Sequence, residues 1–177
     1  MLHPRHFFTT LLLVLFLIPS LPADAEEIKI DGVLDEALWS SAREWTEYFE
    51  SIPFSLAEPK HAQKVLILED EKGMYFGFIN EQPRETIRAN QHQRDNERAN
   101  ADRAGVSIDF DGDGLTAYGF SVSAGGSISD SIYRNENQGN TDWDADWDSA
   151  THIEGDAWFL EMFIPWSIAP MKVQKGD

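Results

Sequence analysis

The sequence predicts an all-β protein, a β-sandwich with one short helix near its N-terminus. Many short stretches alternate apolar and polar side chains, which is the pattern of a strand with one buried face. Turn-forming residues separate these stretches at intervals of about 8–12 residues, as is typical of sandwiches. No alternation of helices and strands indicates a parallel sheet, and the sequence holds no internal repeat or low-complexity segment.

The expected elements follow in chain order. A short strand at 26–30 precedes a helix over 36–42, for which the carboxylate of Asp35 serves as the N-cap. Trp39 on this helix and Trp158 on the last strand are expected in the core. Further strands are expected at 45–49, 63–69, 74–79, 87–90, 126–133, 149–153 and 158–164, with polar loops over 51–61 and 135–148.

A hairpin between residues 104 and 123 is the most regular part of the sequence. Its two alternating strands are joined by DGDG, whose glycines can take the positive φ angles of a tight turn. Asp109, Asp111 and Asp113 converge at its tip, where three carboxylates repel one another unless a cation or a basic side chain neutralises them. Hard oxygen ligands suit Ca²⁺, so calcium is the cofactor that this turn suggests. Two alternatives stay open: an acidic turn with backbone roles alone, and neutralisation by the upstream arginines Arg94, Arg98 and Arg103.

Composition limits the partners. The chain has 177 residues, 42% of them hydrophobic, which is enough for one domain with a core. Thirty-one acidic and fourteen basic residues give a net charge of -17, which argues against nucleic acid and against an anionic membrane surface. The same acidity fits divalent cations and neutral ligands such as sugars. The absence of cysteine excludes disulfides and thiolate metal sites.

Residues 1–25 have the features of a signal peptide. Arg5 lies in a weakly basic start, the apolar run LLLVLFLI follows at 11–18, and Ala23-Asp24-Ala25 supplies a small-x-small cleavage site. The apolar run is too short for a comfortable membrane span, so no direct membrane insertion by this chain is expected. We expect a mature domain over 26–177, exported to the periplasm, the outer membrane or the cell exterior. Its last residues form a hydrophilic tail after a strand, so the domain is expected to be truncated at its C-terminus.

The polar loop TDWDADWD holds two tryptophans among aspartates. Sugars stack their C–H faces on exposed aromatic rings, while carboxylates accept hydrogen bonds from sugar hydroxyls. Trp143 and Trp147 are therefore the candidate carbohydrate platform, with Asp144 and Asp146 as acceptors and Arg94 as a donor. The alternative is that one or both tryptophans belong to the core, because large aromatic side chains are mostly buried.

Glu161 alternates with Leu160 and Met162 and so points to the opposite face of its strand. If that face is buried, the carboxylate needs a basic partner, for which an arginine from 94–103 is expected. A catalytic acid is the sharper interpretation, but the sequence places no second carboxylate to complete a glycosidase pair. No catalytic residue is therefore assigned.

Four segments together resemble, in family order, the family-9-like carbohydrate-binding modules, which have a DOMON-like β-sandwich. They are IKIDGVLDEALWSSA at 28–42, KVLILEDEKGMYFGFIN at 64–80, RDNERANADRAGVSIDFDGDGLTAYGFSVSAGGSISD at 94–130 and WDADWDSATHIEGDAWFLEMFIPW at 143–166. The sequence is particularly similar to modules at the N-terminus of exported bacterial proteins that end in an outer-membrane barrel. The resemblance implies non-catalytic binding of an oligo- or polysaccharide, a role in carbohydrate catabolism, and a downstream outer-membrane barrel as a further partner.

Three alternatives remain beside this module. The first is a domain of a glycoside hydrolase, which hydrolyses O-glycosyl compounds. The second is a haem or electron-transfer module, because the DOMON-like superfold also holds haem, and Met74, Met162 and His152 are the residues able to supply axial ligands. The third is an interaction module associated with the barrel.

Overall fold

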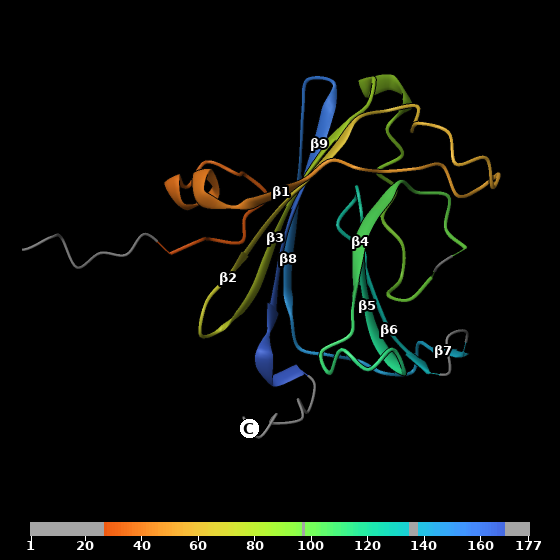
Figure 1. Cartoon of the computed structure of the whole chain (residues 1–177). Coiled ribbons are helices and arrows are strands. Elements are labelled where there is room, and N and C mark those ends of the chain that lie inside the picture. Colours follow the sequence, from red (N-terminus) through yellow and green to blue (C-terminus); the bar gives the residue numbers. More distant parts are fainter. Residues whose placement is uncertain (1–26, 97, 135–137, 169–177) are drawn as a thin grey trace, which may run out of the picture.

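The computed structural model describes residues 27–96, 98–134 and 138–168, which form two facing antiparallel sheets (Figure 1). One sheet has the strand order β1-β2-β3-β9-β8, and the other has the order β4-β5-β6-β7. The predicted all-β sandwich is confirmed. The strands are β1 (Arg43–Trp45), β2 (Gln63–Glu69), β3 (Gly73–Glu81), β4 (Arg103–Ile108), β5 (Thr116–Ser123), β6 (Ile128–Arg134), β7 (Gln138–Asn140), β8 (Asp148–Glu154) and β9 (Ala157–Pro165). The short 3₁₀ helices are η1 (Ala37–Ser41), η2 (Arg84–Thr86) and η3 (Trp166–Ile168).

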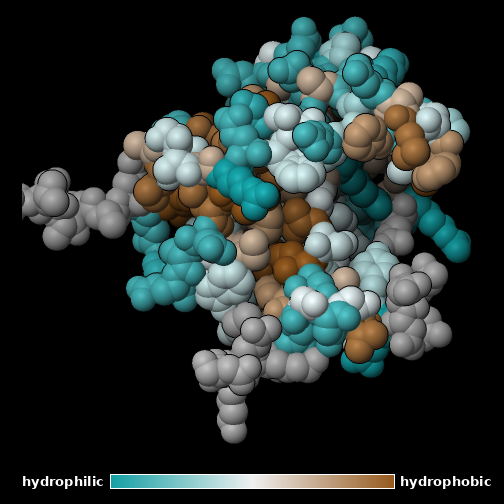
Figure 2. Space-filling view, in the orientation of Figure 1, coloured by the Kyte–Doolittle hydropathy of each residue, from teal (hydrophilic) through white to brown (hydrophobic). Residues whose placement is uncertain are grey.

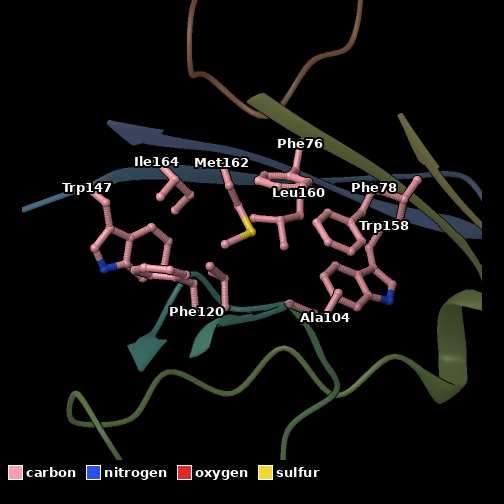
Figure 3. Packing of buried hydrophobic residues seen from close by; sticks show 12 residues of the cluster. Phe76, Phe78, Ala104, Phe120, Trp147, Trp158, Leu160, Met162 and Ile164 are labelled. Atoms are coloured by element: carbon pink, nitrogen blue, oxygen red, sulfur yellow. The ribbon is translucent and has the colours of Figure 1, made fainter. Parts of the chain in front are cut away.

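The main core lies between the two sheets (Figure 3). Alternation along β9 turns Trp158, Leu160, Met162 and Ile164 inward, and each is at most 2% exposed. They pack against residues from β3 and from the four-stranded sheet, namely Phe76, Phe78, Phe120 and Val122. Burying one side chain of this size stabilises the fold by roughly 1.5–3 kcal/mol, so this layer holds the sheets together.

A second, smaller cluster covers the outer face of the five-stranded sheet. Trp39 on η1 is 6% exposed and packs there with Ile28, Leu66 and Tyr75, which confirms its predicted core position. Gly77 makes room for this packing, because a Cβ at this position would lie 2.6 Å from Leu34 Cδ2. The N-terminal segment is therefore part of the folded domain.

The structure differs from the expected elements at five places. The strand expected over 45–49 is β1 at Arg43–Trp45, and the polar loop expected over 135–148 contains β7. The predicted helix is the 3₁₀ helix η1, whose N-cap is Glu36 rather than Asp35 and makes no side-chain capping bond. Residues 27–30 form no strand, because the segment is held by burial of Ile28 and not by a ladder. Residues 87–90 form no strand either, since Asp102 fixes them locally by accepting the amide of Arg88 at 2.8 Å.

Candidate functional site

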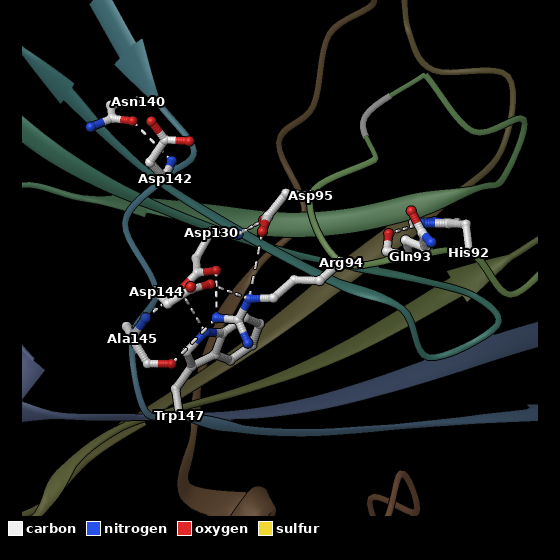
Figure 4. Close-up of polar contacts among 10 residues, drawn as sticks. All are labelled: His92, Gln93, Arg94, Asp95, Asp130, Asn140, Asp142, Asp144, Ala145 and Trp147. Atoms are coloured by element: carbon white, nitrogen blue, oxygen red, sulfur yellow. Dashed lines mark hydrogen bonds and ion pairs between the residues drawn. The ribbon is translucent and has the colours of Figure 1, made fainter.

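Arg94 lies at an edge of the sandwich, where β6 meets the loop over 141–147 (Figure 4). Its Nη2 donates to Asp130 Oδ1 at 2.6 Å, and its Nε lies 2.8 Å from Asp144 Oδ1 and 3.6 Å from Asp95 Oδ2. Carboxylate oxygens of these three aspartates lie within 4.8 Å of one another. Because like charges this close repel, the guanidinium of Arg94 supplies the counter-charge for this acidic group.

Asp130 holds the tryptophan-containing loop in place. Its side chain is fully buried, and its Oδ2 accepts the amide of Ala145 at 2.7 Å and the indole N–H of Trp147 at 3.4 Å. The sequence predicted that an arginine from 94–103 would pair with Glu161 if Glu161 was buried. Arg94 instead pairs with the buried Asp130 on β6.

The two loop tryptophans differ in position. Trp147 is 8% exposed and packs edge-on against Phe120 with ring centroids 5.4 Å apart, so it is a core residue rather than the exposed platform that we expected. Trp143 is half-buried and meets Tyr118 edge-on at 5.2 Å. Asp144 and Asp146 are exposed beside it in sequence. Arg94, Trp143, Asp144 and Asp146 thus stay a prediction for carbohydrate contact at this loop.

The DGDG turn is built by its own carboxylates. Asp109 accepts three backbone amides, from Asp111 at 3.2 Å, Gly112 at 2.9 Å and Gly114 at 2.7 Å. Asp113 accepts the amide of Leu115 at 2.9 Å. Both oxygens of Asp109 therefore have backbone roles, as the alternative for this turn proposed, and the acidic group that converges within 4.8 Å in the described residues lies at Arg94 instead. Calcium at Asp109, Asp111 and Asp113 stays a prediction.

Glu161 is fully buried beneath the N-terminal segment. Its Oε2 accepts the amides of Asp31 at 2.9 Å and Gly32 at 2.8 Å, and its Oε1 accepts the indole N–H of Trp39 at 3.2 Å. Burial raises the pKa of Glu161, and the two backbone hydrogen bonds act in the opposite direction. The prediction of an arginine partner for Glu161 was wrong. Because this carboxylate is fully buried, a bound sugar could not reach it as a catalytic acid.

The three residues considered for haem do not converge. Met162 is fully buried in the main core, against which Met74 also packs. His152 is exposed on β8 and lies beside Phe159, with ring centroids 6.5 Å apart. Because Phe159 precedes the inward-facing Leu160, His152 lies on the opposite face of the sheet from both sulfur atoms. This arrangement provides no axial pair.

A groove beside β1 and β2 was not predicted from the sequence. We call this hollow of about 650 Å³ the aromatic groove. Its lining includes Tyr48, Phe49, Pro59 and Ile79 together with Glu47, Glu58, Gln63, Lys64 and Glu81. Phe49 is 66% exposed, whereas Tyr48 is half-buried against the main core. Partial burial raises the pKa of Tyr48 above its ordinary value of 10.0. The sequence signal for this groove was the pair of adjacent aromatic residues Tyr48 and Phe49 before a proline-containing loop.

A second hollow, of about 340 Å³, adjoins the aromatic groove and shares Tyr48 and Gln63 with it. Trp45 lines this second hollow and is 44% exposed. Its Nε1 already donates to the carbonyl of Glu47 at 2.9 Å, so the exposed part of the indole is apolar.

None of the helices in the described part of the chain has the length and hydropathy of a membrane span.

Among solved structures, the fold is similar to a family 9 carbohydrate-binding module from Caldicellulosiruptor kristjanssonii, determined in complex with cellotriose. The two chains are 15% identical, with a TM-score of 0.52 over 81% of this chain. The match spans 66% of the length of that module. No protein-family model and no curated protein matches the sequence. The chain therefore has a β-sandwich fold of the type found in family 9 carbohydrate-binding modules.

Proposed function

We propose that the protein binds oligosaccharides without cleaving them, and that the aromatic groove is the binding surface. The observation that carries this proposal is the combination of an exposed aromatic side chain with carboxylate and amide groups in one groove. A similar fold binds cellotriose in the solved module, which supports an oligosaccharide as the ligand. The volume of the groove, about 650 Å³, lies within the range of small-molecule sites.

The groove offers both parts of a sugar contact. The ring of Phe49 is open to solvent and can cover the C–H face of a pyranose, while Glu47 and Gln63 can accept hydrogen bonds from its hydroxyl groups. The net charge of -17 favours neutral sugars over acidic ones. We therefore expect a neutral oligosaccharide, with stacking as the main contribution to affinity.

A pair of phenylalanine variants tests the proposal. Phe49→Ala should weaken the binding of cellotriose or another neutral oligosaccharide about fivefold, because one aromatic contact contributes on the order of 1 kcal/mol beyond area burial. Phe54→Ala is the matched control, since Phe54 is 80% exposed on the same loop but does not line the groove. Isothermal calorimetry against a panel of neutral oligosaccharides measures both variants. Equal affinities for the two variants would show that the aromatic groove is not the binding surface.

The loop predicted from the sequence is the second place for the ligand. Asp144→Asn changes an exposed carboxylate beside Trp143 and belongs in the same calorimetric series. If Asp144→Asn weakens binding and Phe49→Ala does not, the ligand lies at this loop. If the protein instead releases new reducing ends from the oligosaccharide, the glycoside hydrolase alternative holds.

We further propose that the protein is exported and serves carbohydrate catabolism beside an outer-membrane barrel. The signal-peptide features of residues 1–25 and the resemblance to barrel-linked modules support this context. Cleavage after Ala25 predicts that the exported protein begins at Glu26. N-terminal sequencing of the protein from the periplasm or the medium measures this directly, and an uncleaved N-terminus would contradict it.

A further inference from the structure

We propose that β4 pairs edge to edge with β4 of a second copy of this chain, which makes the protein a symmetric dimer. Among the described strands, β4 pairs with β5 and with no strand on its other side. Most exposed edge strands carry charges, proline or a bulge that prevents such pairing. Residues 104–108 carry none of these charges and no proline, whereas β1 at the edge of the other sheet carries Arg43 and Glu44.

The direction of the free backbone groups follows from the hydrogen-bond pattern. The carbonyl of Asp102 accepts the amide of Ala124 at 2.8 Å, and the register continues with Ala104 opposite Val122. Hydrogen-bonded and non-hydrogen-bonded positions alternate in an antiparallel ladder. The backbone amides and carbonyls of the even-numbered residues of β4 therefore point toward β5. The amides and carbonyls of Gly105 and Ser107 therefore point away from β5, toward the free edge.

The free edge of β4 borders an opening in the core. The hollow of about 340 Å³ beside it is lined by Val65, Ile67, Phe78 and Val106. Figure 2 shows hydrophobic side chains at the surface between the two sheets at this place. Arg103 also lines the hollow, and its Nε is buried without a hydrogen-bond partner among the described residues. A strand added to β4 would cover this apolar surface.

A second copy of the chain fits this edge by its own symmetry. A two-fold axis through Val106 places Gly105 of one copy opposite Ser107 of the other, so that outward-facing amides meet outward-facing carbonyls. The same register places Arg103 opposite Asp109, the residue directly after β4. Opposite charges thus face each other twice, and no like charges face each other, which favours this pairing over a shifted one. The net charge of -17 on each copy opposes association, and salt screens that repulsion.

The oligomeric state of the full chain tests the proposal. Sedimentation equilibrium over a concentration series should give a reversible dimer that becomes tighter as the salt concentration rises. Ser107→Pro removes one amide at the free edge and leaves the β4–β5 ladder intact, so its dimer should dissociate at least tenfold more readily. Ser107→Thr is the matched control, because it keeps the amide and should dimerise like the original chain.

Hydrogen exchange on the unaltered chain keeps the proposal testable if Ser107→Pro does not fold. The amides of Gly105 and Ser107 should exchange slowly where the dimer is populated and rapidly after dilution. A monomer at every concentration and salt would overturn the proposal. So would a dimer in which a folded Ser107→Pro associates as tightly as Ser107→Thr, or one in which these two amides exchange equally fast before and after dilution.

Discussion

Replacing Arg94 with methionine removes the guanidinium that lies among the carboxylates of Asp95, Asp130 and Asp144. The variant keeps the aliphatic part of the side chain but leaves the fully buried Asp130 beside Asp95 and Asp144 without a counter-charge. Removing one partner of a buried ion pair costs roughly 3–5 kcal/mol. Because the Arg94 side chain is 34% exposed, water screens part of the pairing, and we expect a loss of about 2–3 kcal/mol in the free energy of unfolding.

Thermal unfolding followed by near-ultraviolet circular dichroism measures this loss. For a chain of this size, 1 kcal/mol corresponds to a shift of about 2–4 °C, so the Tm of Arg94→Met should fall by roughly 4–12 °C. The near-ultraviolet signal should also weaken, because Asp130 positions Trp147. Arg88→Met is the matched control: Arg88 is 58% exposed and lies 3.9 Å from Asp102, so its loss should cost less than about 1 kcal/mol.

Adding calcium tests whether Arg94→Met lowers the Tm through the lost counter-charge or through lost packing. Three aspartate oxygens within 4.8 Å of one another are hard ligands once the guanidinium is gone, so millimolar Ca²⁺ should restore part of the Tm of Arg94→Met. The same salt should leave Arg88→Met unchanged. The reasoning would be refuted if Arg94→Met melted at the original temperature without any added cation, because Asp130 would then need no counter-charge.

Three further predictions concern the side chains of Glu161, Trp147 and Asp109. Burial raises the folded-state pKa of Glu161 above its ordinary value of 4.5, so its contribution to stability is fully present below that value and is lost as the pH rises through the folded-state pKa. Urea titrations of Glu161→Gln across that range should lack this decline, whereas a decline identical to that of the original chain would assign it to another group. Trp147→Ala should cost roughly 3–5 kcal/mol in the same urea assay, and an unchanged stability with lost sugar binding would restore the exposed platform. Asp109→Ala should lower the Tm equally in Ca²⁺ and in chelator, because its oxygens hold three amides; a loss confined to Ca²⁺ would establish the calcium site at Asp109, Asp111 and Asp113.

The strands of the sandwich could be predicted because alternation is a local property. The run WFLEMFI within β9 shows this alternation. The run QKVLILE at β2 was predicted on a different local signal, a continuous stretch of β-forming residues. Trp158 was assigned to the core because of the alternation in β9. Trp147 was not, because its neighbours are aspartates and its hydrogen-bond partner Asp130 lies seventeen positions earlier, on β6.

The partners of buried carboxylates could not be predicted from residue types. An arginine upstream of the hairpin was expected to pair with Glu161, but its carboxylate accepts hydrogen bonds from the amides of Asp31 and Gly32 instead. Backbone donors are present in almost every residue, so the sequence gives no sign of which ones a carboxylate will meet. The aromatic groove was missed for a related reason, since exposed Phe49 and half-buried Tyr48 are adjacent in sequence and only the folded loop distinguishes them.

The hydrogen bonds of Glu161 also constrain the order in which the chain can fold. They join residues separated by 122 to 130 positions, from the beginning of the described chain to β9 near its end. During synthesis, the segment that carries Asp31 and Trp39 leaves the ribosome before the nine described strands, whereas its partner Glu161 is made 122 to 130 positions later. Closing so long a loop is slow and entropically costly, so the outer face of β3 stays uncovered until β9 has paired with it. This segment is therefore made before the strands but is fixed in place only after β9 has joined the sheet.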